Sequence, residues 1–289
     1  MGLSGNIRQR GQAPSEPLAL SLLRKLAEAG GEVRTLDTPA GLVRMSIRGP
    51  RGKPPLMILH GLGDSIAGWA QASLPLLAAY RVHIVDLPGH GLSEAPPDWK
   101  LSTMLEGARA AVQSVPHARL VGHSLGGWLA LKLILDGSVT PPGLVLINPG
   151  GAQLSPDAWA PFTQLVLAHD APGARRYLRS AFHSAPRALE LFPGEVIKQM
   201  RAPPIEGVLT ALGEHDFIAP GALANLRVPT RLIWGQSDRL LPRETLAFWR
   251  EELGRSPHAR AHIVTMDKAG HCPHLERPIA LARAIALKL

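Results

Sequence analysis

Short continuous apolar runs recur along the chain, and a polar turn follows each of them. They read PLMILHG, RVHIVDLPGHG, ARLVGHSLGG, GLVLINPGG, TRLIWGQSD and AHIVTMDKAGH. Runs of this length are typical of strands buried on both faces of a sheet. Helical patterns lie between them, as in residues 125–135 and 243–253. The alternation predicts an α/β fold with a mostly parallel central sheet that helices cover on both faces.

The first 50 residues follow a different pattern. Residues 1–16 are rich in Gly, Gln, Ser, Pro and Arg, which predicts a loose arm. Residues 18–29 have apolar positions at helical spacing and end at two glycines. Residues 33–38 and 42–49 alternate in polarity, as the strands of a hairpin do. We therefore assign residues 1–30 to an arm and a helix, and begin the core at residue 31.

Residues 149–225 interrupt the alternation of strands and helices. This segment contains many prolines and aromatic residues and no strand-like run. We expect a helical cap or lid that rests over the strand ends; two or three additional core helices are the alternative. The predicted organisation is thus a first core part at 31–148, the cap at 149–225 and a second core part at 226–289.

Charge and composition narrow the function classes. Hydrophobic residues make up 45% of the 289 residues, enough for a sizeable core. The formal net charge is +8, but the basic residues are scattered, with Arg175, Arg176 and Arg179 the densest group. No aromatic residues interleave with them as a single-strand binding platform requires. We expect no specific nucleic-acid partner.

The distribution of cysteine and apolar residues concerns the location of the protein. Cys272 is the only cysteine, so no internal disulfide forms. No apolar run approaches the roughly 18 residues of a membrane span. The run PLALSLL near the N-terminus is too short for a signal peptide and continues into an amphipathic helix. These features predict a cytoplasmic protein and leave its oligomeric state open.

The segment LVGHSLGG, residues 120–127, carries the strongest chemical signal. A strand that leads directly into a helix turns sharply, and Gly122 and Gly126 flank Ser124 where side chains would crowd that turn. The segment matches the G-x-S-x-G nucleophile elbow in its strand-turn-helix context. A helix-capping role is the alternative interpretation of this serine.

A serine nucleophile needs a base, and the base needs an orienting acid. Asp238 ends one later strand and His271 follows another. The segments HGLGDSIAGW, DLPGHGLS, GHSLGG, WGQSDRLLP and AGHCPHLERP occur in this order. From about residue 33 onward the chain resembles the α/β-hydrolase superfamily, in particular serine esterases and lipases with a helical cap. The resemblance implies Ser124 as nucleophile, His271 as base and Asp238 as acid.

Other residues compete for these roles. His60 and His90 lie on early turns that shape the site in the family, and His274 is expected to begin the last helix. A turn-capping role is the alternative for Asp238. The resemblance also implies an oxyanion hole formed by the backbone N–H groups of Leu62 and Leu125, with Gly63 as the alternative to Leu62.

The implied reaction is hydrolysis of a small-molecule carboxylic ester through an acyl-enzyme, and it needs no metal or organic cofactor. Trp159, Phe162 and Phe182 are candidate pocket residues of the cap. Carbon–carbon bond hydrolysis of diketone-like substrates, acyl transfer and perhydrolysis use the same triad and remain alternatives. A non-catalytic binding protein on this fold is a further alternative. The segments HCPH and EHD resemble metal ligands in composition, but neither has a second partner group at metal-site spacing.

Overall fold

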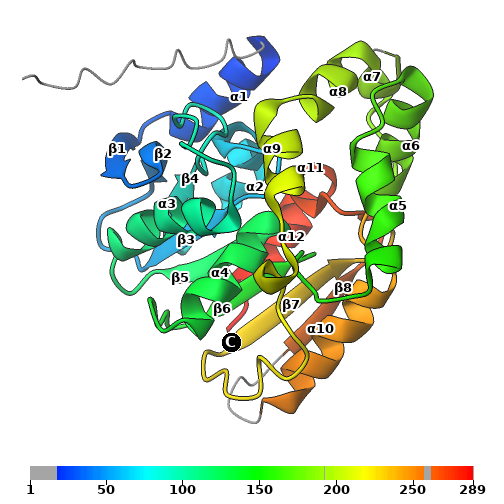
Figure 1. Cartoon of the computed structure of the whole chain (residues 1–289). Helices are drawn as coiled ribbons and strands as arrows, with labels where there is room; N and C mark the ends of the chain where they lie inside the picture. Colours follow the sequence, from blue (N-terminus) through cyan, green and yellow to red (C-terminus); the bar gives the residue numbers. More distant parts are fainter. Residues whose placement is uncertain (1–17, 192, 257–261, 289) are drawn as a thin grey trace, which may run out of the picture.

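A computed structural model describes residues 18–191, 193–256 and 262–288. The arm predicted for residues 1–16 lies outside the described residues. Within them, eight strands form one sheet in the order β1-β2-β4-β3-β5-β6-β7-β8 (Figure 1). The strands are β1 (Glu32–Thr38), β2 (Gly41–Arg48), β3 (Pro55–Leu59), β4 (Arg81–Val85), β5 (Arg119–His123), β6 (Leu144–Ile147), β7 (Thr230–Gly235) and β8 (His262–Met266).

The sheet is parallel except at one edge. Strands β1 and β2 form the predicted hairpin, and β2 pairs antiparallel with β4. From β4 to β8 all neighbours are parallel. The predicted α/β fold class is therefore confirmed. Because the carboxyl ends of parallel strands meet at one edge, the polar turns that follow them gather there.

Successive strand residues pack against helices on opposite faces of the sheet. On one face the core includes α3 (Leu101–Gln113), α4 (Leu125–Leu135) and α10 (Glu244–Arg255). On the other face it includes α1 (Leu18–Glu28), η1 (Ile66–Trp69), α2 (Ala70–Ser73), η2 (Leu74–Ala78) and α12 (Pro278–Ala286). Trp249 and Trp69 are fully buried, one on each face. Burial of both faces explains why the central strands are continuously apolar.

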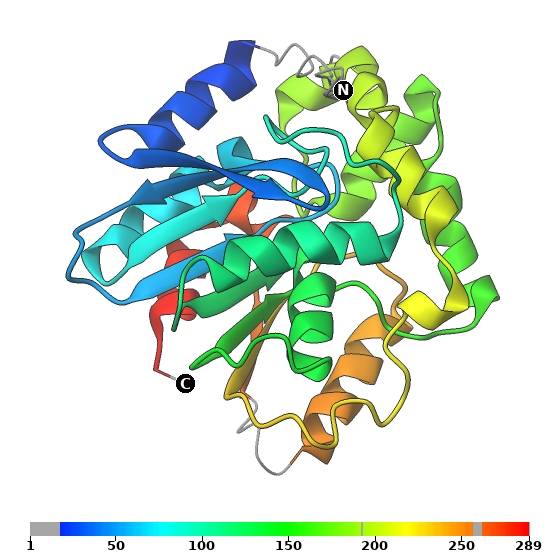
Figure 2. The ribbon, with the colours of Figure 1, turned by 60° about the vertical axis from the view of Figure 1, so that its left-hand side comes forward.

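A third apolar cluster lies in the helices between β6 and β7. These are α5 (Pro156–Val166), α6 (Ala171–Ala181), α7 (Arg187–Leu191), α8 (Pro193–Met200) and α9 (Pro203–Ala211), followed by η3 (Glu214–Asp216). Ala174, Leu178, Phe182, Val196 and Ile205 form its buried centre. Figures 1 and 2 show these helices together on one side of the molecule, drawn in green and yellow.

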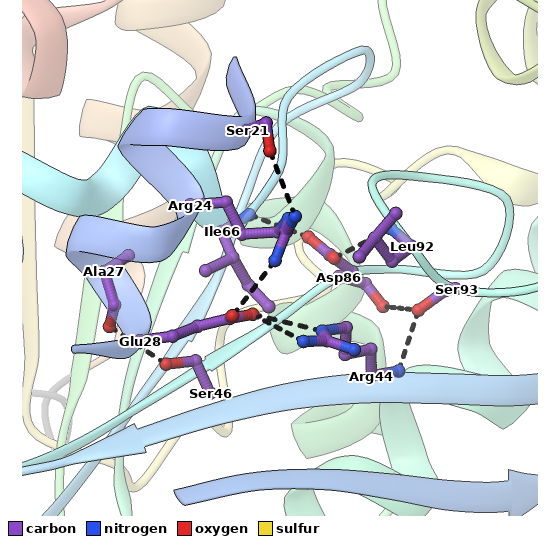
Figure 3. Close-up of polar contacts among 10 residues, drawn as sticks. All are labelled: Ser21, Arg24, Ala27, Glu28, Arg44, Ser46, Ile66, Asp86, Leu92 and Ser93. Atoms are coloured by element: carbon purple, nitrogen blue, oxygen red, sulfur yellow. Dashed lines mark hydrogen bonds and ion pairs between the residues drawn. The ribbon is translucent and has the colours of Figure 1, made fainter. Parts of the chain in front are cut away.

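Ion pairs and hydrogen bonds attach α1 to the sheet (Figure 3). Glu28 pairs with Arg24 at 3.0 Å and with Arg44 on β2 at 2.9 Å, and Ser46 donates a hydrogen bond to the Ala27 carbonyl.

The buried carboxylate of Asp86, just after β4, accepts the Ile66 N–H at 2.7 Å. This bond fixes the start of η1, which follows the loop after β3.

Candidate active site

Ser124 occupies a strained turn between β5 and α4. Its backbone has φ 51° and ψ −116°, a region that residues other than glycine rarely adopt. A Cβ on Gly122 would lie 2.5 Å from the Gly127 Cα, and one on Gly126 would lie 2.1 Å from the Leu59 carbonyl oxygen. Only glycine fits at these two positions, so the close packing of β5, α4 and β3 produces the turn that the sequence predicts.

The structure brings Ser124, His271 and Asp238 together. The His271 Nε2 lies 3.0 Å from the Ser124 Oγ, and its Nδ1 lies 2.8 Å from the Asp238 Oδ2. A carboxylate only accepts, so Nδ1 carries the proton and Nε2 is free to accept the serine proton. The side chains of His271 and Asp238 are 6% and 0% exposed, which shields this arrangement from water.

Asn148 is a site residue that sequence reasoning missed. Its Nδ2 donates to the Asp238 Oδ2 at 2.6 Å, and its Oδ1 accepts the Gly235 N–H. The other Asp238 oxygen accepts the N–H groups of Leu240 and Leu241. Asn148 has φ 41°, which asparagine tolerates better than most residues. The sequence feature that could have indicated it is an asparagine directly after β6, the neighbour of the strand β7 that precedes Asp238.

The loop after β3 packs against the elbow. A Cβ on Gly61 would lie 3.1 Å from the Ser124 Cβ, so this loop approaches the nucleophile closely. Within the described residues, the N–H groups of Leu62 and Leu125 have no hydrogen-bond partner. Leu125 begins α4, where the first amides are unpaired by geometry. Both predicted oxyanion donors are therefore available, and the same holds for the alternative, Gly63.

The competing histidines are engaged elsewhere. The His60 Nε2 accepts the Leu87 N–H, and its Nδ1 donates to the Gly61 carbonyl. His90 donates to the Pro88 carbonyl, and burial lowers its pKa to about 3. His274 lies in the short helix α11 (Pro273–Glu276), not at the start of α12 as predicted. It forms an ion pair with Asp64.

The predicted pocket residues lie in two places in the helical insertion. Trp159 and Phe162 on α5 contact each other edge to face, with ring centroids 5.4 Å apart. Phe182 is buried at the end of α6. Phe162 and Leu62 both pack against the apolar cluster that contains Phe182, so this cluster reaches the loop after β3.

Backbone contacts join the end of α6 to the loops that carry the acid and the base. The His271 N–H donates to the Ala181 carbonyl at 2.7 Å, and the Arg239 N–H donates to that of Ser180 at 3.0 Å. Glu276 accepts the N–H groups of His183, Ser184 and Gly270. No side-chain pattern in the sequence indicates these contacts, because most of their partners are backbone groups.

No described helix is both long enough and apolar enough to cross a bilayer. In comparisons with known proteins, the model of the alpha/beta hydrolase family matches residues 56–284. A pimeloyl-[acyl-carrier protein] methyl ester esterase from Aeromonas salmonicida is 28% identical over 78% of this chain and 91% of its own length. A similar protein from Yersinia pestis is 28% identical over 80% of this chain and 91% of its own.

Solved structures share the fold. A carboxylesterase from Bacillus subtilis superimposes with a TM-score of 0.69 at 21% identity, and the match covers 92% of this chain and 94% of that one. At this identity the likeness shows the arrangement of the chain and not its substrate.

Proposed function

The chain belongs to the alpha/beta hydrolase family, and on that premise we propose that it is a serine hydrolase that cleaves carboxylic esters through an acyl-enzyme. The observation that carries the proposal is the pair of hydrogen-bond contacts that links Ser124 to His271 and His271 to Asp238. The esterase relatives support the reaction class, although their own substrate is not transferred to this chain.

Each of these three residues has a defined task in the proposed reaction. Ser124 Oγ attacks the ester carbonyl while His271 Nε2 takes its proton. His271 then gives this proton to the departing alcohol. Water, deprotonated by the same nitrogen, attacks the acyl-enzyme and releases the acid. Asp238 holds the Nδ1–H tautomer and stabilises the imidazolium as it forms.

The tetrahedral intermediates carry a negative oxygen that needs donors already in place. We assign this task to the N–H groups of Leu62, in the loop that packs against the elbow, and of Leu125, the residue after the nucleophile. The Leu125 amide also belongs to the N-terminal turn of α4, where the helix dipole favours negative charge. Removing one such donor typically costs about 10²- to 10³-fold in kcat. No step requires a metal or an organic cofactor.

The helical insertion at residues 149–225 is proposed as the cap of this site, in a cytoplasmic enzyme. Phe162 from α5 and Leu62 from the oxyanion loop pack on one apolar cluster. An apolar lining suits the acyl chain of a small or medium ester. Trp159, Phe162 and Phe182 therefore remain our candidates for its wall.

The first test is hydrolysis of p-nitrophenyl esters of increasing acyl length by the parent and the Ser124→Ala variant. We expect the variant to lose turnover by at least about 10³-fold, since the nucleophile is gone. It should also resist a fluorophosphonate probe that labels the parent, and keep the parental thermal transition. Parental ester turnover in the alanine variant would exclude the proposal.

The same panel separates the alternatives. A parent that is labelled at Ser124 yet hydrolyses no ester would favour carbon–carbon bond hydrolysis or acyl transfer by the same triad. A parent that is neither labelled nor active would favour a binding protein.

A further inference from the structure

A buried cluster of polar side chains lies behind the triad and takes no part in the proposed chemistry. It consists of Asp64, Trp69, His123 and His274. The side chains of His274 and Asp64 are 1% and 18% exposed, Trp69 is fully buried, and His123 is 3% exposed. Buried polar side chains normally have hydrogen-bond partners, so the contacts among these four residues need to be accounted for.

Three of these four residues come from the three segments that the proposed reaction needs. Asp64 follows the oxyanion residue Leu62 by two positions. His123 directly precedes the nucleophile. His274 follows the base, His271, by three positions. The cluster therefore connects the proposed oxyanion loop, the elbow and the base loop through side-chain contacts.

Two contacts make this connection. The His274 Nε2 lies 3.2 Å from the Asp64 Oδ2, which joins the base loop to the oxyanion loop. The His123 Nε2 lies 2.7 Å from the His271 carbonyl oxygen, and because a carbonyl only accepts, this nitrogen carries the proton. That bond joins the elbow to the base loop.

Trp69 holds the ion pair in place. Its Nε1 donates to the Asp64 Oδ2 at 3.1 Å, and its ring stacks on that of His274 at 4.8 Å with an interplanar angle of 5°. The imidazoles of His123 and His274 are also in contact, with centroids 4.7 Å apart. Asp64 and His274 thus have little freedom to move independently.

The charge state agrees with a pair. Burial alone would raise the pKa of Asp64, but the charge of the nearby His274 lowers it well below the usual value, so Asp64 is ionised. Burial lowers the pKa of His123 well below its usual value, and the neighbouring imidazoles of His274 and His271 act in the same direction, so His123 stays neutral. A neutral His123 keeps its Nε2–H for the His271 carbonyl.

Asp64, His123 and His274 also have the composition of a metal site, with ligand atoms within 4.8 Å of one another. However, Asp64 already accepts hydrogen bonds from Trp69 and from the Ser65 N–H, and it faces His274 directly. These contacts use the carboxylate as a tether, and we therefore do not assign a metal to it.

We propose that the Asp64–His274 pair is a positioning device that holds the oxyanion loop and the base loop in register with the nucleophile. This inference rests on the proposed function, because it concerns the same reacting atoms. The pair touches no substrate; it acts through Leu62 and His271. A displacement of about 1 Å at such groups can cost on the order of 10²-fold in rate.

The test compares Asp64→Asn, His274→Phe and the double variant with the parent. Phenylalanine keeps an aromatic ring on Trp69 but removes the ion pair, and the double variant leaves no unpaired buried charge. His83→Phe is the matched control: His83 is a buried histidine in the middle of β4, 4% exposed, and belongs to no segment of the site. Readouts are kcat and KM for a p-nitrophenyl ester, the rate of fluorophosphonate labelling, and the thermal transition.

We expect each single variant to lose about 10- to 100-fold in kcat and in labelling rate, with KM within about threefold of the parent. The double variant should lose no more than the worse single variant, because the two residues act as one unit. His83→Phe should keep the parental kcat.

Two outcomes would overturn the inference. One is parental kcat in folded Asp64→Asn and His274→Phe proteins; the other is a double variant whose loss is the product of the two single losses. Fluorophosphonate labelling of Ser124 in the parent is measured first. If the proposed function is wrong, the parent itself is not labelled, and this result differs from both outcomes above.

Discussion

At the scale of single residues, Asp238, the proposed acid of the triad, is held by a neighbour to which we assign no proton transfer. Asp238 accepts hydrogen bonds from Asn148, Leu240 and Leu241 in addition to His271. The Asp238 side chain is fully buried, and a buried polar group is costly unless it is hydrogen-bonded. Asn148 therefore supplies one of the hydrogen bonds that this carboxylate requires.

Replacing Asn148 with aspartate should impair the enzyme more than replacing it with alanine. Asn148→Ala removes one donor, whereas Asn148→Asp sets a second carboxylate against Asp238, and one of the two must then take up a proton. We expect kcat/KM to fall about tenfold in the alanine variant and at least about tenfold further in the aspartate variant. Steady-state kinetics at neutral pH measure both. Equal losses in the two variants would contradict this role.

Residue types predicted the side chains that we propose to react, but not the side chains that contact and hold them. Ser124, His271 and Asp238 lie in short motifs whose geometry depends on local glycines and strand ends. Asn148, Asp64 and His274 act through partners as many as 210 positions away, as the Asp64–His274 pair shows. Such pairs come together only when the sheet has formed, so no short sequence motif predicts them.

At the scale of elements, α6 has two structural roles. It contributes Ala174 and Leu178 to the apolar cluster of the helical insertion, and its end contacts the loops that carry Asp238 and His271. Glu276 fastens this end, with its oxygens 2.8 Å and 3.1 Å from the His183 and Ser184 nitrogens and 2.6 Å from that of Gly270. Gly270 itself has no room for a side chain, because a Cβ would lie 2.4 Å from the Ala181 oxygen.

Loss of the Glu276 carboxylate should weaken both the fold and the reaction. Hydrogen bonds to a charged group are each worth about 1.5 to 3 kcal/mol, and Glu276→Ala removes three of them. We expect a lower thermal transition and a reduced kcat, with Glu276→Gln intermediate because it retains one acceptor. Calorimetry and ester turnover on the same preparations provide the comparison. Glu244→Ala, on the exposed start of α10, is the control and should match the parent.

The predicted elements agree with the structure where burial is two-sided. The apolar runs of β3, β5, β6 and β7 mark those strands because helices cover both faces. Between β3 and β4 the chain forms three short pieces, η1, α2 and η2, and not one continuous helix. α10 runs to residue 255, two positions beyond its expected end.

At the scale of the whole molecule, buried histidines govern how the fold responds to acid. Burial lowers the pKa of His83 to about 4 and that of His90 to about 3, and it also lowers the pKa values of His60 and His123. An unfolded histidine titrates near 6.5. Between about pH 6.5 and 4 the unfolded chain therefore binds protons that the folded protein excludes, and stability falls as the pH decreases.

Asp86 acts in the opposite direction. Burial raises its pKa to about 7 despite the N–H groups of Leu92 and Ile66, so the folded protein retains a proton that the unfolded chain releases above about pH 4. The effect of this one carboxyl group on stability is opposite to that of the four imidazoles and smaller than their sum, so acid destabilises the folded protein.

We expect the free energy of unfolding to be lower at pH 5 than at pH 7.5, by on the order of 1 kcal/mol per pH unit for each histidine below its unfolded pKa. Urea titrations at the two pH values measure this difference. His83→Phe should reduce this difference, because the variant lacks one of the imidazoles that take up a proton in the unfolded chain but not in the folded protein. A protein equally stable at both pH values would show that these imidazoles are charged in the folded state.

The junction between α6 and the base loop also sets a boundary for protein engineering. A graft that exchanges the helical insertion would replace the whole segment between β6 and β7. Here such a graft would remove Ser180 and Ala181, whose carbonyls receive the Arg239 and His271 amides. A chimera that keeps residues 179–184 and exchanges the helices on either side should retain a working triad.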